Sequence, residues 1–213
     1  MPSARSSSLT VYVVDDDASI RDSLSLMLGL AGYSTRLFAD AESLLVAFDE
    51  QWAGCIVADL RLPKLSGLEL QAQVRNRGSD IPFVVITAHG DVPAARAAFR
   101  AQAVDFIEKP FEETQLRAAI DAAFALERKR ADAQEGERAL ERKLARLTAR
   151  EREILEHAAK GLHAKEIGTA LGISVRTVEV HKTRIMEKLE VRNIGELVRF
   201  ALLAEKRGNS GSG

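Results

Sequence analysis

Four apolar runs in the first half of the sequence end in side chains that can bind a cation or a phosphoryl group. These runs are residues 11–14 before Asp15, Asp16 and Asp17; 55–58 before Asp59; 83–86 before Thr87; and 104–107 before Glu108 and Lys109. Each run is short, partly β-branched and bounded by turn residues, so each predicts a buried strand. The sequence thus places acids, a hydroxyl and an ammonium at strand ends.

Helix-length segments separate the four runs, and residues 33–38 supply a fifth strand. This alternation of strands and helices predicts an α/β doubly wound, five-stranded parallel sheet. Ligands of such sheets bind outside the carboxyl ends of the strands, where the strand order reverses. We therefore expect the polar side chains to face one crevice.

An acidic crevice of this kind favours phosphoryl chemistry. Asp15, Asp16 and Asp59 would repel one another unless a cation or a proton lay between them. Oxygen ligands with open positions suit Mg²⁺, and an Asp carboxylate can act as a nucleophile that forms an acyl phosphate. Lys109 and the Thr87 hydroxyl would stabilise the transferring group. Taken singly, such acids are more often helix caps, and such a lysine is more often a surface residue. The occurrence of all these groups at the strand ends favours phosphorylation of Asp59.

The net charge of −1 hides an asymmetry between the two ends of the chain. Residues 1–125 carry 11 Lys and Arg against 17 Asp and Glu, whereas residues 148–213 carry 12 against 9. An acidic front and a basic tail indicate different partners. The single Cys55 allows no internal disulfide, and no stretch approaches the ~20 apolar residues of a membrane span. We expect a cytoplasmic protein with no membrane partner.

The middle of the chain predicts a long helix. Residues 111–126 form a helical pattern without a clear stop, and a polar, Ala-rich continuation reaches Leu147. Residues near heptad spacing are Leu126, Ala133, Leu140, Leu144 and Leu147, with Arg130 and Glu137 interrupting. This segment, 127–146, is either a coiled coil, or a charged single helix or loose linker with Gly136 as its weak point. Residues 1–8 and 207–213 are expected to be disordered tails.

After residue 146 the pattern changes to short helices without strands. Thr148 and Glu151 form a capping box before a helix that reaches residue 159, and further helices are predicted over 164–171, 175–189 and 193–206. A tight turn at residues 172–174 joins two of them into a helix-turn-helix. The second domain, residues 147–206, is therefore predicted to be an all-α four-helix bundle.

The helix over 175–189 is the candidate for reading DNA. It places Val178, Ile185 and Leu189 on one stripe for burial, so that its other side chains point elsewhere. Arginines and lysines on such a helix can contact guanine edges and phosphates in the major groove. The candidate contacts are Lys165, Ser174, Arg176, Thr177, Glu179, Val180, Lys182, Thr183, Arg184 and Lys188. Because the positive excess is modest, a helical protein-binding module is the alternative on pattern alone.

The first half carries the motifs of a known domain. They are Val-Val-Asp-Asp-Asp at 13–17, Asp-Leu-Arg-Leu-Pro-Lys-Leu-Ser-Gly at 59–67, Ile-Thr-Ala-His-Gly-Asp at 86–91 and Asp-Phe-Ile-Glu-Lys-Pro-Phe at 105–111. Through them, residues 9–126 resemble the flavodoxin-like receiver domain of two-component response regulators. The resemblance implies that Asp59 is the phosphoacceptor. It also implies that Asp15, Asp16, Asp59 and the Arg61 backbone carbonyl bind Mg²⁺, with Mn²⁺ as the alternative.

The same resemblance implies a switch. Lys109 becomes the phosphate-binding cation, Thr87 the switch hydroxyl and Phe106 the switch aromatic, and the bond from Lys109 to Pro110 is expected to be cis. Phosphorylation would pull Thr87 toward the phosphate, turn Phe106 inward and make the face of the fourth helix, fifth strand and fifth helix competent to pair with a second receiver. We hypothesise that Arg61 and His89 tune the lifetime of the acyl phosphate, the alternative for His89 being an exposed loop residue.

The second half resembles the LuxR-type helix-turn-helix over residues 147–204. The motifs are Leu-Thr-Ala-Arg-Glu-Arg-Glu-Ile-Leu at 147–155, Gly-Leu-His-Ala-Lys-Glu-Ile-Gly at 161–168, Leu-Gly-Ile-Ser-Val-Arg-Thr-Val-Glu-Val-His-Lys at 171–182, Met-Glu-Lys-Leu at 186–189 and Glu-Leu-Val at 196–198. Two departures are Ala164, where the family often has Asn, and Gly168, where it usually has Ala. The glycine is expected to weaken its helix by up to ~1 kcal/mol. His181 is usually packed at the helix base in this family.

A receiver followed by a LuxR-type module resembles the NarL/FixJ family, and the runs after Thr87 and around Lys109 lean toward the FixJ branch. The resemblance implies a regulator that a sensor histidine kinase phosphorylates on Asp59, that forms a homodimer and that binds a double-stranded DNA operator, as an activator by analogy. RNA polymerase is a further candidate partner. No enzyme activity is expected beyond self-phosphorylation and autodephosphorylation of Asp59.

Two other interpretations remain. A phosphohydrolase with an aspartyl phosphate needs a second acid two residues after its nucleophile, and here that position is Arg61. The second is a constitutive dimer, joined through the linker, that binds DNA independently of phosphorylation; the complete set of crevice residues argues against it.

Overall fold

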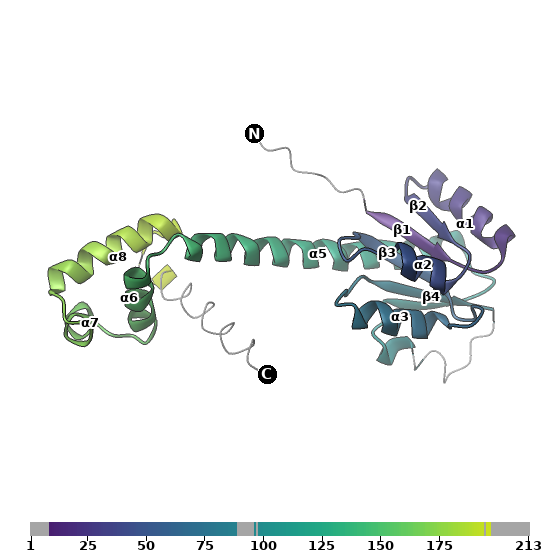
Figure 1. The fold of residues 1–213 in the computed structure, drawn as a ribbon. Helices are drawn as coiled ribbons and strands as arrows, with labels where there is room; N and C mark the ends of the chain where they lie inside the picture. The colour runs from purple at the N-terminus through teal and green to yellow at the C-terminus, as the bar shows by residue number, and fades with distance from the viewer. Residues whose placement is uncertain (1–8, 89–95, 97, 194, 197–213) are drawn as a thin grey trace. The chain divides into compact units, whose positions relative to one another are not determined.

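The structure, a computed structural model, describes residues 9–88, 96, 98–193 and 195–196 (Figure 1). The chain divides into two compact units, residues 1–131 and residues 132–213. The first contains a parallel sheet and the second is helical, which confirms the predicted fold class. Most of the helix predicted over 193–206 lies outside the described residues.

The sheet of the first unit has the strand order β2-β1-β3-β4-β5, and all its neighbouring strands are parallel. The strands are β1 (Thr10–Val14), β2 (Ser34–Phe38), β3 (Gly54–Asp59), β4 (Phe83–Thr87) and β5 (Asp105–Glu108). The order reverses between β1 and β3, because β2 lies on one side of β1 and the later strands lie on the other. Parallel pairing brings the carboxyl ends of β1 and β3 to the same edge, as the alternating pattern predicted.

Polar residues set the start of three helices in this unit. Asp17 caps α1 (Ala18–Leu30) by accepting a hydrogen bond from the Ser19 amide, and Asp40 caps α2 (Ala41–Ala47). Ser66 begins α3 (Gly67–Asn76) with a capping box that Glu69 completes. Such caps satisfy amide groups that have no partner inside the helix.

Two apolar clusters cover the two faces of the sheet. On one face Val11, Val13 and Val57 pack with Leu24 and Leu28 of α1 and with residues of α5 that include Leu116 and Ile120. On the other face Tyr12, Val14 and Ile56 pack with α2 and α3. Because β1 and β3 are buried on both faces, their sequences are continuous apolar runs instead of alternating ones.

The long helix predicted in the middle of the chain is continuous. Figure 1 shows α5 (Glu113–Ala145) as one uninterrupted helix that begins after β5. The loose-linker alternative is therefore wrong for residues 127–145, which are helical through Gly136. Every residue from 131 to 138 is exposed. A coiled coil stays a prediction.

The second unit contains α6 (Ala149–Ala159), α7 (Ala164–Leu171) and α8 (Val175–Leu189). These bounds agree with the three helices predicted over 149–159, 164–171 and 175–189. The helices bury a core that includes Ile154, Ile167, Val178 and Ile185, and Leu144 of α5 packs against it. Among the described residues, no helix has the length and apolar character that would let it cross a membrane.

Candidate functional site

The centre of the candidate site is a bridge made by one lysine. Lys109, at the end of β5, places its Nζ 2.6 Å from Oδ2 of Asp59 and 2.8 Å from Oδ2 of Asp15. The side chains of Lys109, Asp59 and Asp15 are 15%, 11% and 4% exposed, respectively, so the charges lie in a largely dry crevice. Burial alone would lower the pKa of Lys109, but hydrogen bonds to both carboxylates outweigh it and the pKa is raised. The ammonium stays charged and offsets the repulsion between the two acids.

Asp15 is held from several directions. Its Oδ1 accepts a hydrogen bond from the Asp17 amide at 2.9 Å. Its backbone carbonyl accepts a hydrogen bond from Nη1 of Arg21 at 2.7 Å, and its amide donates to the Phe38 carbonyl at 3.3 Å. The β1–α1 turn therefore fixes the buried acid and leaves Asp16 exposed beside it. Arg21 was not among the residues predicted from the sequence; its position in the first turns of α1, next to an acidic loop, was the available signal.

The loop after β3 holds Asp59. Oδ1 of Asp59 accepts a hydrogen bond from the Arg61 amide at 2.8 Å, while the Arg61 side chain is exposed. A Cβ atom at Gly67 would lie 2.5 Å from the Asp59 carbonyl oxygen, so the close return of the loop requires glycine. This role of Gly67 was not predicted from the sequence, because a close approach of two backbone segments leaves no local pattern.

Thr87 and Phe106 lie on neighbouring strands. Thr87 is fully buried at the end of β4, and its carbonyl accepts a hydrogen bond from the Lys109 amide at 2.7 Å. Phe106 is partly buried and packs against Val85 and the two buried alanines that flank the last turn before β5. The peptide bond between Lys109 and Pro110 is cis, as the resemblance predicted. His89 lies outside the described residues.

The acids near the crevice are the candidate ligands of a metal ion. Among the described residues, no three His, Cys, Asp or Glu side chains converge as ligands of one ion, and the Lys109 ammonium contacts both Asp15 and Asp59. The donor chemistry still fits Mg²⁺, since every candidate ligand is an oxygen atom. No hydrogen bond or ion pair within the described residues holds the exposed Asp16 carboxylate in its present position. The ligand atoms of these residues are therefore of the kind that Mg²⁺ prefers.

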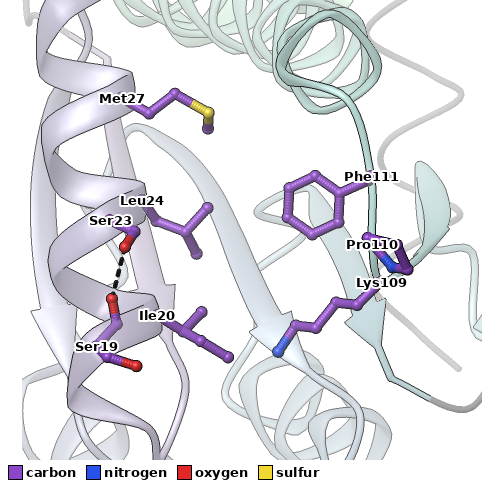
Figure 2. Close-up of a pocket in the computed structure, with 8 residues that line it drawn as sticks. All are labelled: Ser19, Ile20, Ser23, Leu24, Met27, Lys109, Pro110 and Phe111. Atoms are coloured by element: carbon purple, nitrogen blue, oxygen red, sulfur yellow. Dashed lines mark hydrogen bonds between the residues drawn. The ribbon is translucent and has the colours of Figure 1, made fainter.

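A groove beside the bridge separates α1 from the segment that follows β5 (Figure 2). Its volume is about 330 Å³. The lining residues are Ser19, Ile20, Ser23, Leu24, Met27, Lys109, Pro110 and Phe111. Figure 2 shows Phe111 facing α1 and the Lys109 side chain extending toward Ile20. The groove is thus mostly apolar and ends at the cation that bridges the acids.

Comparison with known proteins decides the family. Residues 11–121 match the response regulator receiver domain, and residues 145–201 match the bacterial regulatory proteins of the luxR family. The transcriptional regulatory protein FixJ of Bradyrhizobium diazoefficiens is 40% identical over 194 residues, which cover 91% of this chain and 95% of that protein. The chain belongs to the NarL/FixJ family of response regulators.

Other relatives support this family. The response regulator protein TodT of Pseudomonas putida is 36% identical over 189 residues. The match covers 89% of this chain and 83% of that protein. A solved structure of the response regulator StyR is 41% identical with a TM-score of 0.82, and the match covers 91% of this chain and 98% of that one. A full-length FixJ structure from B. japonicum is 39% identical with a TM-score of 0.56, over 92% of this chain and 97% of that one.

The LuxR-type module of this response regulator presents one side of α8 to solvent. The exposed residues on α8 include Arg176, Glu179, Val180, Thr183 and Arg184, and Lys165 is exposed on α7. Val180 is 44% exposed, so an apolar side chain lies among the polar ones on this side of the helix. Exposed basic, polar and apolar side chains on one helix can meet phosphates, base edges and thymine methyl groups.

Four of the predicted DNA contacts have roles inside the module. The expectation that Lys182 points away from the buried stripe is wrong, because Lys182 is only 9% exposed and its Nζ lies 3.4 Å from Glu179. It falls four residues after Val178, so helical periodicity placed it on the buried side. Lys188 lies 2.6 Å from Glu151. Ser174 caps α8 and shares a hydrogen bond with Thr177.

The two departures from the LuxR pattern can be placed. A Cβ atom at Gly168 would lie 2.8 Å from the Ile173 carbonyl oxygen, so glycine lets the turn between α7 and α8 close tightly here. Ala164 is the first residue of α7 and is partly buried. His181 is partly buried, and its Nδ1 has no hydrogen-bond partner within the described residues. Its position agrees with a packing role.

Proposed function

We propose that a sensor histidine kinase phosphorylates this response regulator on Asp59, and that phosphorylation promotes dimerisation and binding to an operator. The observation that carries the proposal is the Lys109 bridge, which holds Asp59 beside a second buried acid at the strand ends. The same chain carries the LuxR-type module. The output is therefore control of transcription, and activation is the outcome that we propose by analogy with the family.

The residues of the crevice would divide the chemistry as follows. An Asp59 carboxylate oxygen attacks the phosphorus, the bond from phosphorus to the kinase histidine nitrogen breaks, and the imidazole leaves with the electron pair. Lys109 is already hydrogen-bonded to Asp59 and can follow the charge onto the phosphoryl oxygens. Asp15, Asp16, Asp59 and the Arg61 carbonyl would hold Mg²⁺, or Mn²⁺, which when bound offsets the negative charge of the phosphoryl group.

Thr87 and Phe106 are the proposed switch. Thr87 ends the strand next to β3, and its carbonyl is tied to the Lys109 amide. A phosphoryl group on Asp59 would draw the Thr87 hydroxyl and the Lys109 ammonium toward the new oxygens. Phe106 pairs in register with Val85 of β4, two residues before Thr87 along that strand. A shift of Thr87 would therefore change the packing around Phe106 and the surface formed by β5 and α5.

The groove along α1 is the proposed docking place for the kinase. Its apolar lining could take an amphipathic helix of the partner, and Lys109 at its end lies beside the phosphoacceptor. A partner seated there would bring its phosphohistidine to the crevice.

Arg61 and His89 are proposed to set the lifetime of the acyl phosphate. The exposed Arg61 side chain stands beside Asp59 and could govern how water approaches the phosphorus. Dephosphorylation rates of Arg61→Ala and His89→Ala test this idea, and unchanged rates in both variants would contradict it.

Light scattering of the wild type and Asp59→Asn, each with and without beryllofluoride and Mg²⁺, tests the proposed function. We expect a shift from monomer to dimer in the treated wild type alone. A dimer in all four samples would favour a constitutive regulator whose assembly is independent of phosphorylation. Intact-mass measurement after treatment with acetyl phosphate would show directly whether Asp59 accepts the phosphoryl group.

A further inference from the structure

The last turn of α5 lies against the carboxyl end of α8. Lys143 Nζ lies 2.9 Å from Oε2 of Glu190, the residue that ends α8, and it donates a hydrogen bond at 3.1 Å to the carbonyl of Leu189. Arg146 Nη1 lies 3.4 Å from Oε1 of the same glutamate. Two cations that belong to the end of α5 and the turn after it thus meet one end of the DNA-binding helix.

The charges suit the groups that they meet. The last carbonyls of a helix have no partner inside the helix, and they carry the negative end of its dipole. Lys143 satisfies one of these carbonyls, and its side chain is only 26% exposed. Glu190 has a left-handed φ of 57°, which ends the helix and turns the chain. Hydrogen bonding to Lys143 lowers the pKa of Glu190, so its carboxylate stays charged near neutral pH.

A second contact ties the same end of α8 to α6. Lys188, in the last turn of α8, lies 2.6 Å from Oε2 of Glu151, which is only 4% exposed. Glu151 also accepts hydrogen bonds from the Thr148 amide and hydroxyl, which form the capping box of α6. The segment between α5 and α6 is therefore held at both ends by the carboxyl end of α8.

We infer that Lys143 and Arg146 are positioning residues for DNA binding: with Glu190 they form a clamp that fixes α8 to the last turn of α5. Lys143 lies before the start of the matched luxR region at residue 145. The clamp would extend the DNA-binding unit into the linker helix, so that movement of α5 is passed to α8 and not lost in a loose joint. This inference rests on the DNA-binding role proposed above.

The exposed residues of α5 provide matched controls. Arg142, beside Lys143, forms an ion pair at 2.5 Å with Glu135 of its own helix, and both side chains are 64% exposed. Arg142→Gln removes the same charge as Lys143→Gln, and Glu135→Gln removes the same charge as Glu190→Gln. Neither control residue has an interaction with α8 within the described residues. Each pair of variants therefore separates a change in charge from loss of the clamp.

The first measurement is amide hydrogen exchange of the full-length chain. We expect Lys143→Gln and Glu190→Gln to speed exchange at the carboxyl end of α8, with no change in the two controls. Equal exchange in all four variants would overturn the inference, since a clamp that leaves α8 unaffected positions nothing. Exchange elsewhere in the second unit checks that the variants remain folded.

The second measurement uses a duplex that the wild-type chain enriches from a random-sequence pool. We expect Lys143→Gln to bind this duplex about three- to tenfold more weakly than Arg142→Gln does, because the helix end has lost its cation. The salt dependence of the two variants should agree, since each has lost one charge. A lower salt slope for Lys143→Gln would show instead that Lys143 contacts a phosphate, and would overturn the clamp.

For Glu190→Gln, the clamp and simple electrostatics predict opposite changes in the affinity for DNA. Loss of a negative charge should strengthen attraction to DNA, as we expect for Glu135→Gln. The clamp predicts weaker binding, and it predicts that Lys143→Gln costs less in the Glu190→Gln background than alone. Additive effects would overturn the inference. If the wild type enriches no duplex, the proposed function fails and the inference with it; if it does and the variants behave like their controls, only the inference fails.

Discussion

Oδ2 of Asp59 and Oδ2 of Asp15 share the ammonium of Lys109, at 2.6 Å and 2.8 Å. The lysine reaches them from β5, two strands away from β3 in the sheet order. The bridge offsets the repulsion between the two acids, and it gives both carboxylates a cationic partner. If Mg²⁺ binds to these acids as proposed, we expect it to compete with Lys109 for the carboxylates.

Lys109→Gln should destabilise the first unit and sensitise it to magnesium. Removal of one partner from a buried ion pair leaves the two acids uncompensated, which costs about 3 kcal/mol in the free energy of unfolding. Mg²⁺ should recover more stability in the variant than in the wild type, where the ammonium competes with the metal. Thermal unfolding with and without Mg²⁺ measures both effects. Lys64→Gln is the control, because Lys64 is 79% exposed in its ion pair with Glu42 and its loss should change stability little. Equal magnesium stabilisation in wild type and Lys109→Gln would contradict the competition.

Gly67→Ala should distort the loop that holds Asp59. The added methyl group would lie 2.5 Å from the Asp59 carbonyl oxygen, so the backbone must shift, at a cost of about 1–3 kcal/mol. We expect a lower melting temperature and slower phosphorylation by acetyl phosphate. Gly29→Ala in α1 is the matched control, because nothing lies within 4 Å of a Cβ at that position. That substitution should stabilise the helix by about 0.5–1 kcal/mol. A normal phosphorylation rate in Gly67→Ala would show that the loop tolerates the shift.

Much of the fold follows from local patterns, because each pattern reflects burial along one element. Continuous apolar runs identified β1 and β3, and polar caps such as Thr148 identified the start of α6. The end of a strand also fixes which side chains meet at the sheet edge, so the meeting of Asp15, Asp59 and Lys109 could be predicted. The direct ion pairs of Lys109 with both acids could not be predicted. The sequence pattern shows which side chains lie at the same edge of the sheet, but it does not show which of them form hydrogen bonds with one another.

The prediction that Lys182 points away from the buried stripe was wrong for a physical reason. Lys182 follows Val178 by four residues and precedes Leu189 by seven, so its spacing fits the buried stripe. Its charge suggested exposure, but a lysine can bury its long stem while its ammonium reaches a carboxylate at the rim. The close approach of Gly67 to the Asp59 carbonyl joins two backbone segments and leaves no periodic signal in the sequence.

Glu127→Gln should change how stability depends on pH. Glu127 in α5 is 3% exposed, and burial raises its pKa above the ordinary value of 4.5 although Arg130 lies 2.9 Å away. The folded state therefore holds the proton more tightly than the unfolded state. The stability that this provides is fully present below pH 4.5 and is lost as the pH rises through the raised pKa. The glutamine side chain does not titrate, so the stability of the variant relative to the wild type should increase as the pH rises from below 4.5 to neutral. Urea unfolding at several pH values measures the difference, and a constant difference would contradict the raised pKa.

Arg184→Gln and Lys182→Gln should separate contact with DNA from packing. Arg184 is exposed on α8, so its loss should weaken binding to the selected duplex and lower the salt slope by about one, with little change in unfolding. Lys182 is 9% exposed and lies beside Glu179, so its loss should lower the melting temperature while the salt slope stays close to that of the wild type. Binding isotherms at several salt concentrations, with thermal unfolding of the same samples, distinguish the two roles. A lower salt slope for Lys182→Gln would show that Lys182 contacts DNA. Only a residue that neutralises a phosphate changes the number of counterions released on binding.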